Sequence, residues 1–163
     1  MSGCRASSAC TCRPVDSYVD NWTKGRLPTR PSHVIVRDGH LGGHVKIAIV
    51  DDDRSVRKAL ARVLATEDIE TSTYASGPEF LISLSEQIPD CLMLDIQMPG
   101  MNGPEVQRRL RESGFSMPII IITGNDDSSF VRHMIEAGAI ACFSKPVDIR
   151  LLLDTIRRAV VRN

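Results

Sequence analysis

From Lys46 onward, short apolar runs alternate with longer segments of helical periodicity, and this alternation most limits what the chain can fold into. Each run has the length, and the content of β-branched and large apolar residues, that is typical of a buried strand. The runs occupy residues 47–50, 69–74, 91–94, 118–122 and 141–143. We therefore expect five strands, most of them buried on both faces.

The segments between the runs carry the signals of helices. In residues 54–66, Leu60 and Leu64 lie on one face of a helix. Ser76 and Asn102 each precede a glutamate by three residues, as in a capping box. The expected helices are residues 54–66, a segment opening at Ser76, a segment opening at Asn102, residues 128–137 and residues 148–161.

Strict alternation of strands and helices predicts one architecture. Right-handed crossovers make successive strands parallel, with helices covering both faces of the sheet. Five strands favour a flavodoxin-like, doubly wound α/β fold with strand order 2-1-3-4-5 and five helices. In such sheets ligands bind beyond the carboxyl ends of the strands, at the switch point between the first and third strands.

Residues 1–44 differ from the rest in composition. They are rich in Ser, Arg, Gly, Pro and Thr, show no sustained periodicity, and carry six Lys/Arg against three Asp/Glu. This composition is typical of a disordered leader. The alternative is that the leader is spurious and that translation starts near Val45. Either way, the folded domain is expected to be residues 45–163.

The folded part carries fourteen Lys/Arg against seventeen Asp/Glu, and this mild acidity argues against a nucleic-acid-binding surface. No apolar run approaches the roughly 18 residues that span a bilayer. The N-terminus also lacks the apolar segment of a secretory signal. We therefore expect a cytoplasmic protein without membrane contact.

Polar side chains stand at the carboxyl ends of four expected strands. They are Asp51, Asp52 and Asp53 after the first strand, Asp95 after the third, Thr123 after the fourth and Lys145 after the fifth. Taken singly, each has an ordinary role, such as a helix cap for Asp53. Together they gather carboxylates at one sheet edge, where two of them about 5 Å apart repel by roughly 3 kcal/mol at an effective dielectric near 20. Lys145 neutralises one charge, so the pattern predicts a hard divalent cation, with Mg²⁺ as the best fit.

Four segments match the signature segments of a known family. They are KIAIVDDDRSVRKAL, CLMLDIQMPGMNG, IIIITGNDD and ACFSKPV. These segments resemble the receiver domain of two-component response regulators, and they are most similar to receivers attached to nitrogen-fixation-type transcriptional regulators. The resemblance spans residues 45–163. It implies the flavodoxin-like fold and a role in phosphorelay signalling, and it implies that the chain is not an enzyme.

The resemblance also implies a role for each strand-end residue. Asp95 matches the phosphoacceptor, Thr123 the switch hydroxyl, and Lys145 the lysine that pairs with the phosphoryl group. The implied Mg²⁺ ligands are Asp51, Asp52, Asp95 and the backbone carbonyl of Gln97. The peptide bond that follows Lys145 is usually cis in the family. The implied phosphoryl donor is a sensor histidine kinase or a histidine phosphotransfer protein.

The sequence departs from the family pattern at Cys142. The family carries Tyr or Phe three residues before the lysine, and the movement of this ring couples to the switch hydroxyl. Phe143 does not replace the ring, because neighbouring side chains of a strand point to opposite faces. We therefore expect a conformational response that is weak or takes another route, while phosphorylation persists.

Arg54, Arg57 and Arg62 lie off the apolar face of the first expected helix. Such a set is commonly a solvated face, and the alternative is a patch that docks the kinase. The family resemblance implies kinase contacts on this helix and on the loop after the last strand.

The chain stops at Asn163, at the end of the last expected helix, and no helix-turn-helix follows. We therefore expect a stand-alone receiver that signals to a protein effector and does not bind DNA directly. Two alternatives remain open. One is a pseudo-receiver that is never phosphorylated. The other is a haloacid-dehalogenase-type phosphatase with Asp51 as nucleophile and Asp53 as acid/base, which leaves Asp95 unexplained.

Overall fold

The computed structural model of the protein describes residues 35–37, 40–42, 45–124 and 128–161. Its main sheet consists of five parallel strands, and their order is β4-β3-β5-β6-β7. The strands are β3 (Lys46–Val50), β4 (Glu70–Tyr74), β5 (Cys91–Asp95), β6 (Ile119–Thr123) and β7 (Ala141–Ser144). Counted along this sheet the order is 2-1-3-4-5, so the expected flavodoxin-like topology is confirmed.

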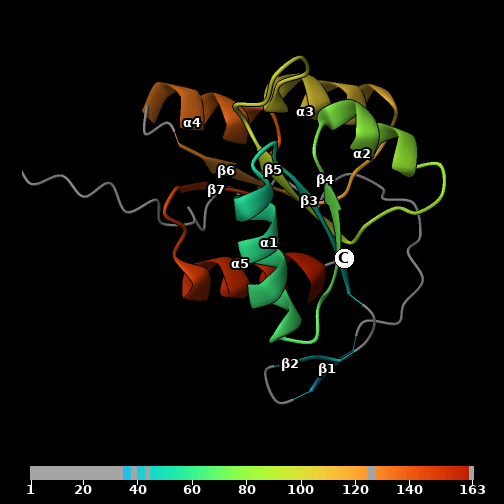
Figure 1. Ribbon diagram of the computed structural model, residues 1–163, viewed down its shortest axis with the longest axis vertical. Helices are drawn as coiled ribbons and strands as arrows, with labels where there is room; N and C mark the ends of the chain where they lie inside the picture. Colours follow the sequence, from blue (N-terminus) through green and yellow to red (C-terminus); the bar gives the residue numbers. More distant parts are fainter. Residues whose placement is uncertain (1–34, 38–39, 43–44, 125–127, 162–163) are drawn as a thin grey trace, which may run out of the picture.

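Helices cover both faces of the sheet (Figure 1). One face carries α1 (Arg54–Ala65) and α5 (Ile149–Val161). The other face carries α2 (Gly77–Ser83), α3 (Gly103–Glu112) and α4 (Ser128–Glu136). Among the residues that the structure describes, no helix has both the length and the apolar composition needed to cross a bilayer.

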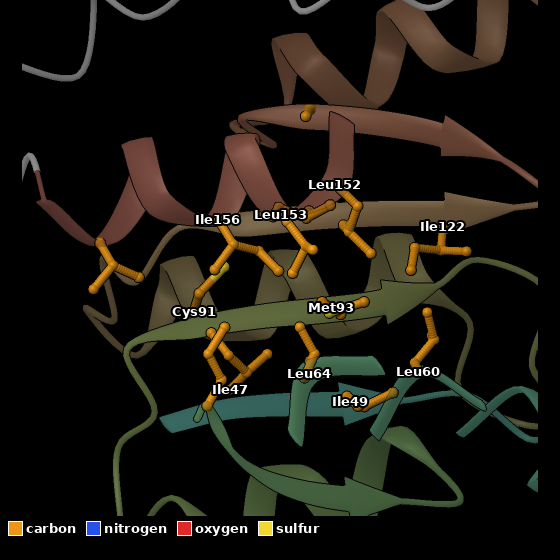
Figure 2. Packing of buried hydrophobic residues seen from close by; sticks show 14 of the residues in the cluster. Ile47, Ile49, Leu60, Leu64, Cys91, Met93, Ile122, Leu152, Leu153 and Ile156 are labelled. Atoms are coloured by element: carbon orange, nitrogen blue, oxygen red, sulfur yellow. The ribbon is translucent and has the colours of Figure 1, made fainter. Parts of the chain in front are cut away.

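Alternating side chains of the strands divide the core into two clusters. Figure 2 shows the first cluster, in which Ile49 and Met93 of the sheet pack with Leu64 of α1 and Ile156 of α5. The second cluster lies on the opposite face, where strand residues pack under α2, α3 and α4. Its largest fully buried members are Phe80, Leu92, Leu94, Leu110, Ile121 and Met134. Both faces of the central strands are therefore buried, and the partly exposed edge strand β4 is the exception.

Side-chain caps set the starts of several helices. Asn102 accepts a hydrogen bond from the Glu105 N–H at 2.9 Å, and Ser76 accepts one from the Glu79 N–H at 3.4 Å. The Asp148 side chain accepts a hydrogen bond from the Arg150 N–H at 3.0 Å, and α5 begins at Ile149. Asp148 therefore precedes the helix, whereas the sequence predicted that the helix begins at this residue. Capping satisfies N–H groups that have no partner within the helix.

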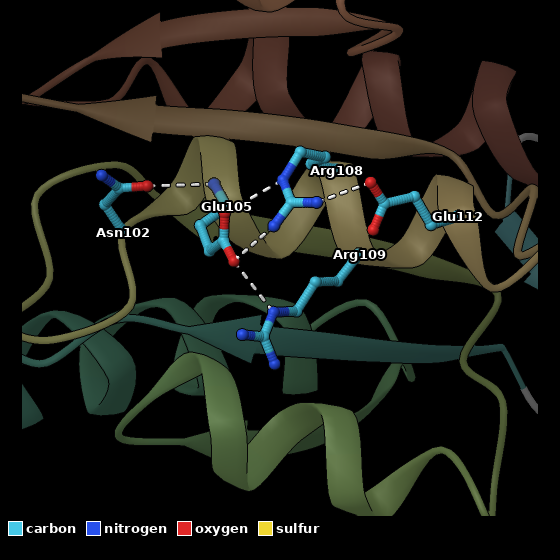
Figure 3. Close-up of polar contacts among 5 residues, drawn as sticks. All are labelled: Asn102, Glu105, Arg108, Arg109 and Glu112. Atoms are coloured by element: carbon cyan, nitrogen blue, oxygen red, sulfur yellow. Dashed lines mark hydrogen bonds and ion pairs between the residues drawn. The ribbon is translucent and has the colours of Figure 1, made fainter.

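α3 has an apolar face and a charged face. Its apolar face buries Val106 and Leu110 against the sheet. On the charged face, Arg108 reaches Glu105 at 2.7 Å and Glu112 at 2.5 Å, as Figure 3 shows. Because exposed ion pairs contribute only about 0–1 kcal/mol each, the burial of the apolar face is what holds α3 in place.

The segment before the domain contains a short antiparallel pair, β1 (Ile35–Arg37) and β2 (His40–Gly42), which forms a sheet separate from the main one. The expected disordered or spurious leader, residues 1–44, otherwise lies outside the described residues and stays a prediction.

Candidate functional site

The parallel sheet brings the predicted strand-end residues to one edge. Asp51 follows β3, Asp95 ends β5, Thr123 ends β6, and Lys145 follows β7. Asp51, Asp95 and Thr123 are 2%, 3% and 0% exposed, although each is polar. Buried polar groups at a sheet edge need partners, and Lys145 supplies one to both Asp51 and Asp95.

The Lys145 side chain, which follows β7, bridges the carboxylates at the ends of β3 and β5. Its Nζ lies 2.9 Å from Asp51 Oδ2 and 3.0 Å from Asp95 Oδ1. The peptide bond between Lys145 and Pro146 is cis, as the family resemblance implied. One ammonium group is therefore shared by two buried carboxylates.

A third carboxylate completes an acidic triad. Asp51, Asp52 and Asp95 each offer an oxygen, and these oxygens lie within 4.8 Å of one another. Asp52 is exposed, so the triad opens to solvent on its side. Three carboxylates facing one ammonium leave excess negative charge. A few carboxylates with room for water are the ligands that Mg²⁺ prefers, so the residues present fit this ion.

Burial and neighbouring charges shift the pKa values of Asp95 and Lys145, the two ionisable groups that face each other at this edge. Burial raises the pKa of the Asp95 carboxyl, and the neighbouring Asp51 adds to this rise, while the hydrogen bond from Lys145 opposes it. Burial would lower the pKa of Lys145, but its hydrogen bonds to Asp51 and Asp95 outweigh burial and raise it. Lys145 therefore stays charged, and a further cation would stabilise the ionised form of Asp95.

The loop before α1 holds Asp51 in place. The Asp51 N–H donates to the Tyr74 carbonyl at 3.3 Å, and Asp51 Oδ1 accepts the Asp53 N–H at 2.8 Å. Arg57 of α1 donates from its guanidinium to the Asp51 carbonyl at 2.5 Å. The Asp53 side chain caps α1 through the Ser55 N–H, which lowers the pKa of Asp53. The predicted cap at Asp53 is thus confirmed.

Arg57 is the residue that sequence reasoning missed, because it was grouped with the solvated arginines of the first helix. A signal was available. Side chains on a helix tilt toward its N-terminus, and Arg57 follows Asp51 by six residues, so a long side chain can reach back to that strand end.

The chain passes close to Asp95 again after the turn that follows β5. A Cβ on Gly103 would lie 2.7 Å from the Asp95 carbonyl oxygen and 2.9 Å from the Ile96 Cα, so only glycine fits. The Gln97 N–H donates to Asp95 Oδ2 at 3.0 Å, which places Gln97 beside the triad. The role of the Gln97 carbonyl as a metal ligand stays a prediction.

Cys142 and Phe143 occupy opposite faces of β7, as expected from strand alternation. Cys142 belongs to the core cluster under α2, α3 and α4, whereas Phe143 belongs to the cluster under α1 and α5. Phe143 therefore does not stand in for an aromatic residue at position 142.

Comparison with known proteins decides the family. A family model described as "Response regulator receiver domain" matches residues 47–157. The chain belongs to this family. The receiver is 40% identical over 114 residues to Response regulator protein TmoT of Ectopseudomonas mendocina, a match that covers 70% of this chain and 52% of TmoT. It is 42% identical to a response regulator receiver protein from Burkholderia phymatum of known structure, with a TM-score of 0.65, covering 72% of this chain and 95% of that chain.

The comparisons also correct one expectation. The chain spans about half the length of the curated relatives that it matches, such as TmoT. Another relative is the DNA-binding transcriptional regulator NtrC of Salmonella typhimurium, 34% identical over 112 residues, which make up 69% of this chain and 24% of NtrC. The expectation of no direct DNA binding was wrong, because it was drawn from the end of the chain, and relatives such as NtrC are DNA-binding regulators that contain a receiver. As a family, receivers are signalling modules of two-component systems.

Proposed function

We propose that Asp95 accepts a phosphoryl group in a two-component phosphorelay. The donor is a phosphohistidine on a sensor histidine kinase or a histidine phosphotransfer protein, and the relay operates in the cytoplasm. One observation carries the proposal: Asp95 is buried, shares Lys145 with Asp51, and lies within 4.8 Å of two further carboxylates. A purely structural role for so many like charges would be costly.

The transfer follows from the groups at the site. A carboxylate oxygen of Asp95 attacks phosphorus, an O–P bond forms, and the P–N bond to the donor imidazole breaks with its electron pair going to nitrogen. Lys145 leaves one of its two carboxylate partners and pairs with a phosphoryl oxygen. Before the transfer, its hydrogen bonds to Asp51 and Asp95 raise the pKa of Lys145, so it meets the phosphoryl group in its charged form.

Asp51, Asp52, Asp95 and the Gln97 carbonyl would hold Mg²⁺, which supplies positive charge against the phosphoryl oxygens when bound. The part played by the chain is to keep these ligands in place. Asp51 is anchored through its N–H, its carbonyl and both carboxylate oxygens. Asp95 is held between Lys145 and the Gln97 N–H.

The output is a shift between two conformations. The Thr123 side chain lies buried at the end of β6, next to β7 in the sheet, where its hydroxyl can turn toward a phosphoryl group on Asp95. Cys142 provides no ring to follow this movement. We propose that the signal passes instead through β6 and the helices packed on its face, chiefly α4.

The test is incubation with Mg²⁺ and acetyl phosphate, followed by intact-mass analysis. We expect one phosphoryl adduct, lost in Asp95→Asn and reduced in Asp51→Asn. Asp53→Asn is the matched control, because asparagine also caps helices well, and it should keep the adduct. An adduct on Asp51 with steady turnover of phosphate esters would indicate the phosphatase. No adduct with any donor, phosphohistidine included, would indicate the pseudo-receiver.

A further inference from the structure

The basic residues of α1 do not all face solvent. Arg54, Lys58 and Arg62 are exposed, whereas Arg57 is half-buried. The Arg57 guanidinium donates to the Asp51 carbonyl at 2.5 Å, beside the acidic triad. A cation held next to a site for another cation calls for a physical reason.

That reason lies in the peptide that joins Asp51 to Asp52. The N–H of Asp51 and its two carboxylate oxygens bind Tyr74, Asp53 and Lys145, and these bonds hold Asp51 itself. The bond from Arg57 acts on the Asp51 carbonyl, which belongs to the planar unit leading into Asp52. Orienting this carbonyl therefore orients the backbone from which the exposed Asp52 carboxylate projects.

The helix itself does not use this carbonyl. Its first turn starts later, with the Arg57 N–H donating to the Asp53 carbonyl at 3.1 Å. The carbonyl of Asp51 is a strong acceptor that needs a donor when it lies in a half-buried loop. Arg57 thus closes the loop twice, by its backbone onto Asp53 and by its side chain onto Asp51.

We propose that Arg57 is a positioning residue for the metal site: its bond to the Asp51 carbonyl aligns Asp52 with Asp51 and Asp95. The inference rests on the proposed Mg²⁺ site and adds a residue to it. Packing does not fix the Asp52 side chain, since it is exposed, so its orientation depends on the backbone that carries it. Residues that orient metal ligands commonly change metal affinity about 10–100-fold when they are replaced.

Charge alone predicts the opposite effect. The Arg57 guanidinium repels an incoming cation, so its removal would strengthen Mg²⁺ binding if electrostatics dominated. Loss of alignment would weaken it. The sign of the change in affinity therefore separates the two accounts.

The test is a calorimetric titration of the full chain with Mg²⁺ alone. In Arg57→Met the apolar stem remains and the donor is lost, and we expect the Kd for Mg²⁺ to rise about tenfold. Lys58→Met is the matched control, because it removes the same charge from an exposed neighbour, and its Kd should stay within twofold or fall slightly. A Kd for Arg57→Met that is unchanged or lower would overturn the proposal.

Two further readouts exclude a merely structural role. Arg57→Lys keeps the charge and one donor, and should recover part of the lost affinity; a Kd equal to that of Arg57→Met would count against the proposal. With acetyl phosphate, Arg57→Met should need about tenfold more Mg²⁺ for half-maximal phosphorylation, with a maximal rate within twofold of wild type. A lowered maximal rate at an unchanged Mg²⁺ requirement would refute positioning of the metal site.

The metal-free protein offers an independent check. Without Mg²⁺, hydrogen exchange at the Asp53 amide, which donates to Asp51 Oδ1 at 2.8 Å, should speed up in Arg57→Met, while exchange in β5 and β6 stays unchanged. Equal exchange in both proteins would remove the basis of the inference. A wild-type chain that binds no Mg²⁺ would instead refute the proposed function, so the two failures are distinguishable.

Discussion

Replacing Asp95 by asparagine should stabilise the metal-free protein, even though it removes an ion pair. Asp95 is 3% exposed and lies among like charges. Its asparagine counterpart keeps the shape of the side chain and an oxygen that can accept the Gln97 N–H. The change therefore removes a buried charge while leaving the hydrogen bond to the backbone.

The magnitude follows from the distances at the site. Lys145 lies 3.0 Å from Asp95, an attraction of about 5.5 kcal/mol at an effective dielectric of 20. The oxygens of Asp51 and Asp52 lie within 4.8 Å, and each would repel by about 3.5 kcal/mol on the same scale, less for the exposed Asp52. These terms nearly cancel, which leaves the desolvation cost of the Asp95 charge. We expect a gain of about 1–2 kcal/mol, or a rise in Tm of about 2–8 °C.

The pH dependence has a definite sign. Burial raises the folded-state pKa of Asp95 above its unfolded value. The contribution of Asp95 to stability is therefore fully present below the unfolded pKa and is lost as the pH rises through the folded pKa. Asp95→Asn lacks this titration. Its advantage over wild type should be smallest in acid and should widen as the pH rises through the raised pKa.

The assay is thermal and urea unfolding of wild type, Asp95→Asn and the control Asp53→Asn, with and without Mg²⁺. Saturating Mg²⁺ at 100 times its Kd should stabilise wild type by about 2.7 kcal/mol, so the order of stability should reverse. A metal-free Asp95→Asn protein that is less stable than wild type at pH 7 would refute the reasoning.

Three further changes test other parts of the structure. Asp52→Asn should remove most of the Mg²⁺-dependent rise in Tm without lowering the metal-free Tm, since Asp52 is exposed but belongs to the triad; a full Mg²⁺ response would contradict the assigned ligand. Gly103→Ala should lower the free energy of unfolding in urea by about 1–3 kcal/mol, because its Cβ would lie 2.7 Å from the Asp95 carbonyl oxygen. In the control Gly124→Ala the Cβ meets nothing nearer than 4.0 Å, so the loss of stability should be far smaller. Phe80→Ala should lower the free energy of unfolding by about 3–5 kcal/mol. Ile82 is 74% exposed, so Ile82→Ala should change it by no more than about 0.5 kcal/mol. Equal losses in the same urea experiment would show that α2 packs differently.

The strands were predictable because their apolar runs are short and end at polar residues. Each predicted strand matches an observed one to within one residue at either end. The convergence of Asp51, Asp95 and Lys145 followed from parallel topology alone, since the carboxyl ends of parallel strands share one edge. Asp148 was misplaced by one residue, because the same side chain suits the cap and the first turn.

By contrast, the direction in which a long polar side chain extends from its helix could not be predicted from periodicity. The six-residue spacing from Asp51 allows the long side chain of Arg57 to reach back to the Asp51 carbonyl, but the spacing does not decide between this bond and a solvated side chain. Gln107 is a similar case. It is 2% exposed on α3 and donates to the Met134 carbonyl of α4 at 3.4 Å, a contact across 27 residues that no local pattern predicts.

The division of the core by the sheet has a consequence for how such a chain can diversify. Cys142 and Phe143 are neighbours in sequence, yet they belong to clusters on opposite sides of the sheet. Each side chain packs with a different set of residues, since the members of the two clusters are separated by the sheet. The face under α4 can therefore exchange a ring for a thiol without a compensating change beneath α1 and α5. A receiver built in this way can change how it reports its state on one face while the packing on the other face keeps its own residues.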